Sequence, residues 1–220
     1  MILTNVEVPA YVPEHIKKTL GLLTGEVQDL HLARCLFWDL CIDRPETVTL
    51  INRTAPRFFR RLQTILFEHL VLGIARLTDP LSPAWNRNLG LRDLFLNSAP
   101  TQLDALQAQA ADIRKIRGKI VAHLDWRIGL DPSGLPGDKI FHKIRACTDL
   151  MVEVINLAWV QWADGGFTML DSDAMEITNC LKKAAAYDEI EKAGGIMQDF
   201  WNAPTDMKQE FLARIRAKSE

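Results

Sequence analysis

The sequence has no long hydrophobic run. Its purely apolar stretches, such as residues 70–75, fall far short of the roughly 20 residues needed to span a bilayer. The first thirteen residues carry Glu7, two prolines and no basic start, which does not match a secretory signal peptide. We therefore expect no membrane contact.

The sequence has few cysteines, and their spacing does not suggest that they act in pairs. The four cysteines form no CxxC pair and have no spacing typical of a zinc site or a disulfide framework. They are interpreted as reduced thiols, which predicts a cytoplasmic protein. The formal net charge of −2 over 220 residues gives no global attraction to nucleic acid, so any phosphate contact would need a local basic patch.

Several common catalytic motifs are also missing. The chain has no GxGxxG, no GxxxxGK[ST], no HExxH and no GxSxG, and no histidine follows a glutamate by three residues. These absences exclude the usual dinucleotide, P-loop, zincin and hydrolase-elbow sites, and the ExxH sites of di-iron bundles. We expect no cofactor and no metal site: the chemistry is metal-free, or there is none.

Helical periodicity dominates the sequence, and no strand-like alternation persists between turn signals. It predicts a single all-α domain over 1–220: an up-and-down bundle of four to five main helices in about 13–163, with a helical C-terminal extension over about 167–220. The expected helices cover 13–42 (with a break near 21–25 left open), a short one from Pro45, 58–77, a turn at 91–96, 101–124, 138–162, 173–192 and 205–216. Thr101 and Asp104 suggest a capping box for the fifth of these.

Apolar stripes predict which faces are buried. In the segment 58–77, one side is lined by Phe59, Leu62, Leu66, Leu70 and Ile74, and is widened by Ile65, Leu72 and Ala75. In the segment 138–162, a stripe is formed by Ile140, Ile144, Cys147, Met151, Val154 and Ala158. We expect the first of these helices to lie centrally in the bundle.

Arg117 occupies an unusual place in the helix expected over 101–124. It projects from the middle of an apolar face that is otherwise formed by Leu106, Ala110, Ile113, Ile120 and Leu124. A buried arginine is costly unless it is paired. Two explanations stay open: an ion pair with Asp79 or Glu68, or a stripe that faces a groove or a subunit interface.

Cations surround this arginine, at Arg114, Lys115 and Lys119. His123 follows six residues after Arg117, about 9 Å further along a helix axis. Such a charge run is usually a solvated face, but here it surrounds an inward-pointing arginine.

The segment Arg117-Gly118-Lys119-Ile120-Val121-Ala122-His123 resembles the Arg-x4–6-His signature of the HEPN superfamily (higher eukaryotes and prokaryotes nucleotide-binding). Together with the Leu-Asp that follows it, and with Ala75-Arg76-Leu77-Thr78-Asp79-Pro80 at the end of an earlier helix, it is similar to the subgroup linked to abortive infection. The resemblance covers about residues 30–162.

This resemblance implies a homodimeric, metal-independent endoribonuclease that acts in phage defence or as a toxin, with RNA as substrate and an antitoxin as a further partner. It implies that Arg117 stabilises phosphate and that His123 acts as acid or base. Arg114, Lys115 and Lys119 would position the RNA backbone. Gly118 departs from the pattern, since a polar residue usually stands there, and Trp126 stands where one branch has a modifiable tyrosine. The alternatives are a non-catalytic module that binds RNA, nucleotide or protein, and a helical interaction protein.

Overall fold

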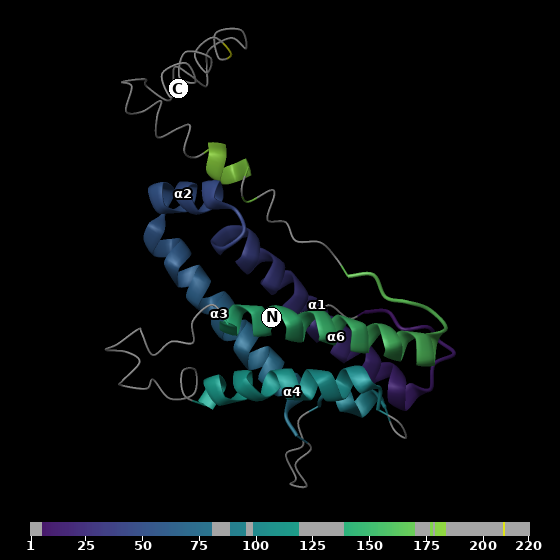
Figure 1. Cartoon of the computed structure of the whole chain (residues 1–220). Coiled ribbons are helices and arrows are strands. Elements are labelled where there is room, and N and C mark those ends of the chain that lie inside the picture. Colours follow the sequence, from purple (N-terminus) through teal and green to yellow (C-terminus); the bar gives the residue numbers. More distant parts are fainter. Residues whose placement is uncertain are drawn as a thin grey trace. The chain divides into compact units, whose positions relative to one another are not determined.

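The computed structural model describes residues 6–80, 89–95, 99–118, 139–169, 177, 179–183 and 209. These residues form helices and connecting segments and no strand, so the all-α prediction is confirmed. The elements are α1 (Glu14–Cys41), α2 (Pro45–Thr54), α3 (Pro56–Thr78), a 3-10 turn η1 (Leu91–Leu94), α4 (Thr101–Ile116) and α6 (Lys139–Ala163) (Figure 1). No helix in this described part is long and apolar enough to cross a membrane.

The chain divides into two compact units. The first comprises residues 1–38 and 62–172, and contains most of α1, the C-terminal part of α3, and all of η1, α4 and α6. The second comprises 39–61 and 173–220. In the second unit, α2 begins with Pro45 as expected and buries Thr47 and Ile51. Residues 177 and 179–183 are helical as expected, while most of the two helices predicted for the C-terminal extension lies outside the described residues.

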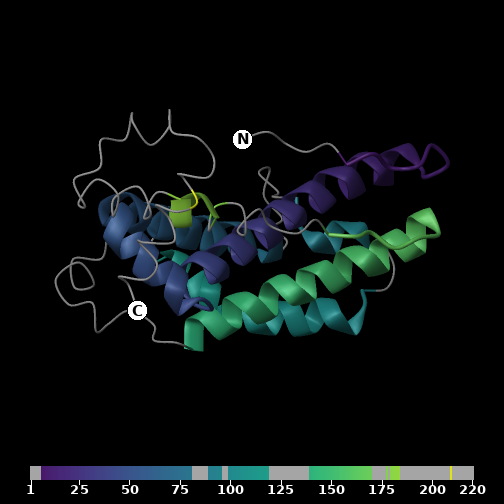
Figure 2. The ribbon, with the colours of Figure 1, turned by 90° about the horizontal axis from the view of Figure 1, so that it is seen from above.

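The first unit is an up-and-down arrangement of four helices. Leu30 of α1 meets Gly73 of α3, and Thr24 of α1 accepts a 2.9 Å hydrogen bond from Trp159 Nε1 of α6. Since Phe37 of α1 also stacks on Phe141 at the other end of α6, α1 and α6 run in opposite directions (Figure 2). Helices α4 and α6 lie side by side (Figure 1). The predicted bundle is therefore present.

Helix α6 packs along its predicted stripe. Every residue of its predicted stripe is buried, from Ile140 to Ala158. Trp162 donates a 3.0 Å hydrogen bond from Nε1 to the carbonyl of Leu94, which ties α6 to η1. The helix ends at Ala163, where Asp164 takes a left-handed conformation (φ 50°) just before Gly165, so the predicted stop is confirmed.

The break that the sequence left open near residues 21–25 is absent, because helix α1 continues through them. Two local predictions were wrong. The capping box at Thr101 is absent because Pro100 occupies the N-cap of α4 and Thr101 is already helical. Ile65 and Leu72 of α3 are 46% and 44% exposed, although Leu66, Leu70, Ile74 and Ala75 are buried as expected. The described residues thus leave Ile65 and Leu72, on one face of α3, substantially exposed.

Gly73 gives a test of the α1–α3 contact. A Cβ at Gly73 would lie 2.4 Å from Cδ2 and 3.0 Å from Cδ1 of Leu30, a side chain that is 1% exposed and has little room to move. A Cβ at Gly118 would meet nothing within 4 Å. Since both changes raise helix propensity, Gly73→Ala is expected to be less stable than Gly118→Ala by about 1–3 kcal/mol, the usual cost of overpacking. Urea unfolding of the two variants measures this difference; equal stabilities would contradict the close approach.

Candidate functional site

Two helix ends meet at the predicted site. Asp79 directly follows α3, and Arg117 directly follows α4 as its C-cap residue. Nη1 of Arg117 lies 2.9 Å from Oδ1 and 2.8 Å from Oδ2 of Asp79. Of the two partners that the sequence left open, the structure selects Asp79. Leu106, Ala110 and Ile113, three members of the stripe that contains Arg117, are buried as predicted.

The ion pair is not sealed in the core. The side chain of Arg117 is 37% exposed and that of Asp79 is 19% exposed. An arginine buried against a carboxylate would have no surface left for a substrate, whereas more than a third of this side chain reaches solvent. A cation is also favoured at this place, because the C-terminal ends of helices carry partial negative charge.

Helix α4 ends at Ile116, and Arg117 and Gly118 continue it as a π-helical turn. Arg117 keeps helical dihedral angles (φ −48°, ψ −49°), and its N–H donates to the carbonyls of Ile113 and Arg114. Such turns occur often at functional sites, since they redirect side chains away from the regular helix face. Gly118 is exposed with open space around its Cβ position, so a polar side chain would have room here.

Arg114 joins α4 to the last turn of α3. Its Nη1 donates to the carbonyl (3.0 Å) and to Oγ1 (3.2 Å) of the buried Thr78, the residue before Asp79. The same guanidinium also donates to the carbonyl and to the side chain of Gln107, each at 3.2 Å. Arg114 therefore fixes the backbone next to Asp79. No local pattern indicates this role, because the partners lie 36 and 7 residues away along the chain.

Replacing Arg114 tests this bracing role. Arg114→Ala is expected to lower the free energy of unfolding by about 2 kcal/mol, since charge-assisted hydrogen bonds are lost and the Thr78 carbonyl loses its cationic donor. Arg114→Lys is expected to restore little of the lost stability, because one ammonium group cannot reach both Thr78 and Gln107 as the forked guanidinium does. Lys115→Ala, on the exposed face, serves as the control. Urea unfolding curves in which Arg114→Ala matches this control would rule the brace out.

Lys115 points to a different neighbour. Its Nζ lies 3.1 Å from Oδ1 of Asp112, and Lys143 of α6 contacts the other oxygen of the same carboxylate. The hydrogen bond from Lys143 and then that from Lys115 lower the pKa of Asp112, so it is a carboxylate at neutral pH. Lys115 itself is 74% exposed, which leaves it accessible to a polyanion.

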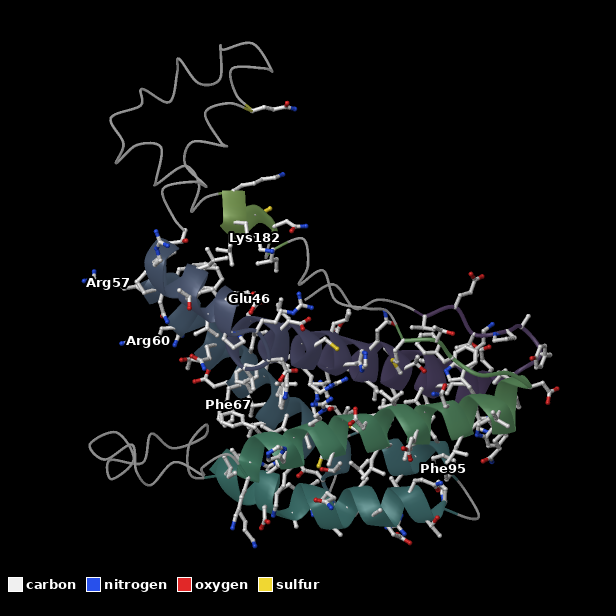
Figure 3. All side chains as sticks on the ribbon, turned by 45° about the horizontal axis from the view of Figure 1, so that its top comes forward. Glu46, Arg57, Arg60, Phe67, Phe95 and Lys182 are labelled. Carbon is white, nitrogen blue, oxygen red and sulfur yellow. The ribbon has the colours of Figure 1, made fainter. Side chains whose placement is uncertain are left out.

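The structure thus brings together part of the predicted site. Arg114 and Arg117 both reach the end of α3, and Lys115 lies on the exposed face of the same turn. His123 and Lys119 lie outside the described residues. Among the described residues, no group of three or more His, Cys, Asp or Glu side chains could hold a metal ion. In the second unit, Arg57 and Arg60 project from α3 as a further basic surface (Figure 3).

Comparison with protein families places this geometry in context. A family model described as AbiU2, of the HEPN type, matches residues 13–180 and so covers α1 to α6 together with the Arg117 segment. Comparison with curated proteins and comparison with solved structures each returned no match. Because the family match extends over most of the chain, this protein belongs to the AbiU2 family of HEPN domains, a family associated with abortive infection.

Proposed function

We propose that this protein is a HEPN-like, metal-independent endoribonuclease that acts as a homodimer in phage defence or as a toxin. The observation that carries the proposal is Arg117, whose guanidinium is oriented by Asp79 at the junction of α3 and α4 while its side chain stays 37% exposed. An oriented and accessible guanidinium suits a group that binds a phosphate and stabilises extra negative charge.

The reaction uses the 2′-hydroxyl of RNA as its nucleophile. This oxygen attacks the adjacent phosphorus, and the 5′-oxygen of the next nucleotide leaves, which gives a 2′,3′-cyclic phosphate and a 5′-hydroxyl end. His123 moves protons at neutral pH, since an imidazole has a pKa near 6.5 in its ordinary state. Arg117 holds the phosphorane oxygens as their charge grows. Lys115 and Lys119 position the RNA backbone. Arg114 contributes by holding the backbone of Thr78, next to Asp79.

The homodimer is supported by the face of α3 that the described residues leave exposed. Ile65 and Leu72 lie seven residues apart, so they share one face of the helix that ends beside Asp79, and both are substantially exposed. Exposed apolar side chains in one row favour burial against a partner. Light scattering on the purified protein distinguishes a dimer from a monomer; a monomer at all concentrations would overturn the homodimer. The antitoxin partner stays a prediction from the family resemblance.

The test of the activity is cleavage of a mixed RNA substrate in EDTA. Wild-type protein is expected to cut the RNA and to leave cyclic phosphate ends, while a DNA substrate of the same sequence stays intact because it lacks the 2′-hydroxyl. Metal-free cleavage with these ends supports the mechanism above. Intact RNA, or cleavage that needs a divalent metal ion, overturns it.

A non-catalytic binding module is the second candidate. It is favoured by the contact of both Asp79 oxygens with Arg117 Nη1, which is the geometry of a structural ion pair, and by the missing side chain at Gly118. In that case RNA or nucleotide binds without being cut. A filter-binding measurement beside the cleavage assay separates the two candidates.

A further inference from the structure

Three chemically active side chains lie on one face of α1, away from the Arg117–Asp79 pair. His31, Arg34 and Cys35 are separated by three and four residues, the spacing that brings side chains of a helix into contact. Nδ1 of His31 lies 3.3 Å from Nη2 of Arg34. Nε2 of the same ring lies 3.6 Å from Sγ of Cys35, within hydrogen-bond range for sulfur. The imidazole thus stands between a guanidinium and a thiol.

The contacts place the proton on this histidine. A guanidinium has N–H donors and no acceptor, so Nδ1 of His31 must accept the hydrogen bond from Arg34. A neutral imidazole with an accepting Nδ1 carries its proton on Nε2. That N–H points at Cys35, so the sulfur is the acceptor in this pair. A thiolate accepts such a bond more strongly than a thiol, because the bond is then charge-assisted.

Arg34 is held in place and keeps its charge. Its side chain is 12% exposed, and Nη2 lies 3.6 Å from Oδ1 of Asp149 on α6. Its Nε is buried and makes no hydrogen bond within the described part of the chain. Since Asp149 is half exposed and touches only one end of the guanidinium, part of the positive charge stays uncompensated beside His31. A nearby positive charge favours the thiolate form of a cysteine.

Two other cysteines of the same chain provide a contrast. Burial raises the pKa of Cys41 to about 11 and that of Cys147 to about 12. Both therefore stay protonated and unreactive at neutral pH. Cys35 is partly exposed, and a donor, Nε2 of His31, is directed at its sulfur.

We propose that Cys35 is a reactive thiol, activated by His31 and Arg34, and that it is the site at which small electrophiles such as hydrogen peroxide modify this protein. The thiolate sulfur attacks one oxygen of the peroxide, an S–O bond forms and the O–O bond breaks. Hydroxide leaves and takes up a proton as water, the sulfur is oxidised to a sulfenic acid and the peroxide is reduced. None of these residues takes part in the proposed RNA cleavage, so the two proposals stand or fall separately.

Alkylation of the full-length protein tests the activation. At pH 7 with limiting iodoacetamide, peptide mapping is expected to show Cys35 labelled more than a hundredfold faster than Cys41. The pKa of Cys41 is about 11, so an ordinary thiol, two units lower, would already react about a hundredfold faster than Cys41. His31→Ala distinguishes activation from simple access. The smaller side chain opens the path to the sulfur, so access alone would make labelling of Cys35 faster, whereas loss of the donor makes it severalfold slower. Cys41 is expected to react at the same rate in both proteins.

Peroxide provides the second arm of the test. Wild-type protein treated with hydrogen peroxide and trapped with dimedone is expected to carry the label at Cys35, and Cys35→Ser is expected to lose it. The proposal is overturned if labelling of Cys35 does not exceed this hundredfold margin over Cys41, if His31→Ala leaves the labelling rate of Cys35 unchanged or raises it, or if dimedone labels other cysteines equally well.

Discussion

Arg117→Ala is expected to lower the rate of RNA cleavage by about a hundredfold or more, the usual cost of removing one donor that stabilises charge in a transition state. The effect should fall on kcat, since the charge on the phosphorane oxygens exceeds that on the ground-state phosphate. His123→Ala is expected to cost about 10²–10⁴-fold, the range for a general acid or base. Gel-based cleavage rates at saturating RNA measure both losses.

Lys115→Ala is the matched control for these variants. It removes a cation from the same turn, but one that is 74% exposed and paired with Asp112, so it should weaken RNA binding and leave the rate at saturating RNA within about threefold. Circular dichroism must first show that each variant is folded. If wild type cleaves RNA and Arg117→Ala or His123→Ala cleaves it equally well, those residues are not at the centre of the reaction.

The helices could be predicted because their apolar residues repeat with the period of an α-helix. The stripe of α6 repeats every three or four residues, and all of its predicted positions are buried. Helix α2 begins at Pro45 as predicted, where a fixed proline φ and a missing N–H suit the first turn. Helix α3 begins at Pro56, slightly before its predicted start at residue 58. These signals act within one helix and need no knowledge of its neighbours.

The candidate site could be predicted only in part because its contacts join distant segments. The sequence singled out Arg117 as an arginine on an apolar face, yet it left open whether its partner is Asp79 or Glu68, or whether the face borders a groove or interface. The choice depends on how α3 and α4 pack, which places Asp79 at the end of α3 beside the end of α4. For the same reason, no local pattern in the sequence predicts the hydrogen bond from Arg114 to Thr78 or the ion pair between Lys143 and Asp112.

Exposed apolar residues escaped prediction for a related reason. Ile65 and Leu72 were expected to widen the buried face of α3, because helical periodicity reports apolarity and not what covers it. A face that is buried by a second copy of the chain has the same pattern as one that is buried within a single chain. The homodimer of the proposed function would reconcile the pattern with the exposure.

Asp79→Ala is expected to reduce the kcat of RNA cleavage by about thirty- to a hundredfold, with KM within about twofold. Asp79 touches Arg117 rather than the substrate, so it is a positioning residue: without it the guanidinium can move by an ångström or more, a displacement that costs up to about 10²-fold in rate. The free energy of unfolding should fall by only about 1 kcal/mol, since Arg117 is exposed enough to turn toward solvent. Steady-state kinetics and urea unfolding of one preparation separate the two effects.

Asp79→Asn is the informative partner of this variant. Its amide oxygen can still accept one hydrogen bond from Arg117 but provides no negative charge, so a rate between those of wild type and Asp79→Ala is expected if orientation is what matters. A purely structural pair would change the unfolding free energy and leave kcat of the folded protein unaltered. Faster cleavage by Asp79→Ala would contradict the positioning role. It would mean that the carboxylate restrains Arg117 and competes with phosphate for it.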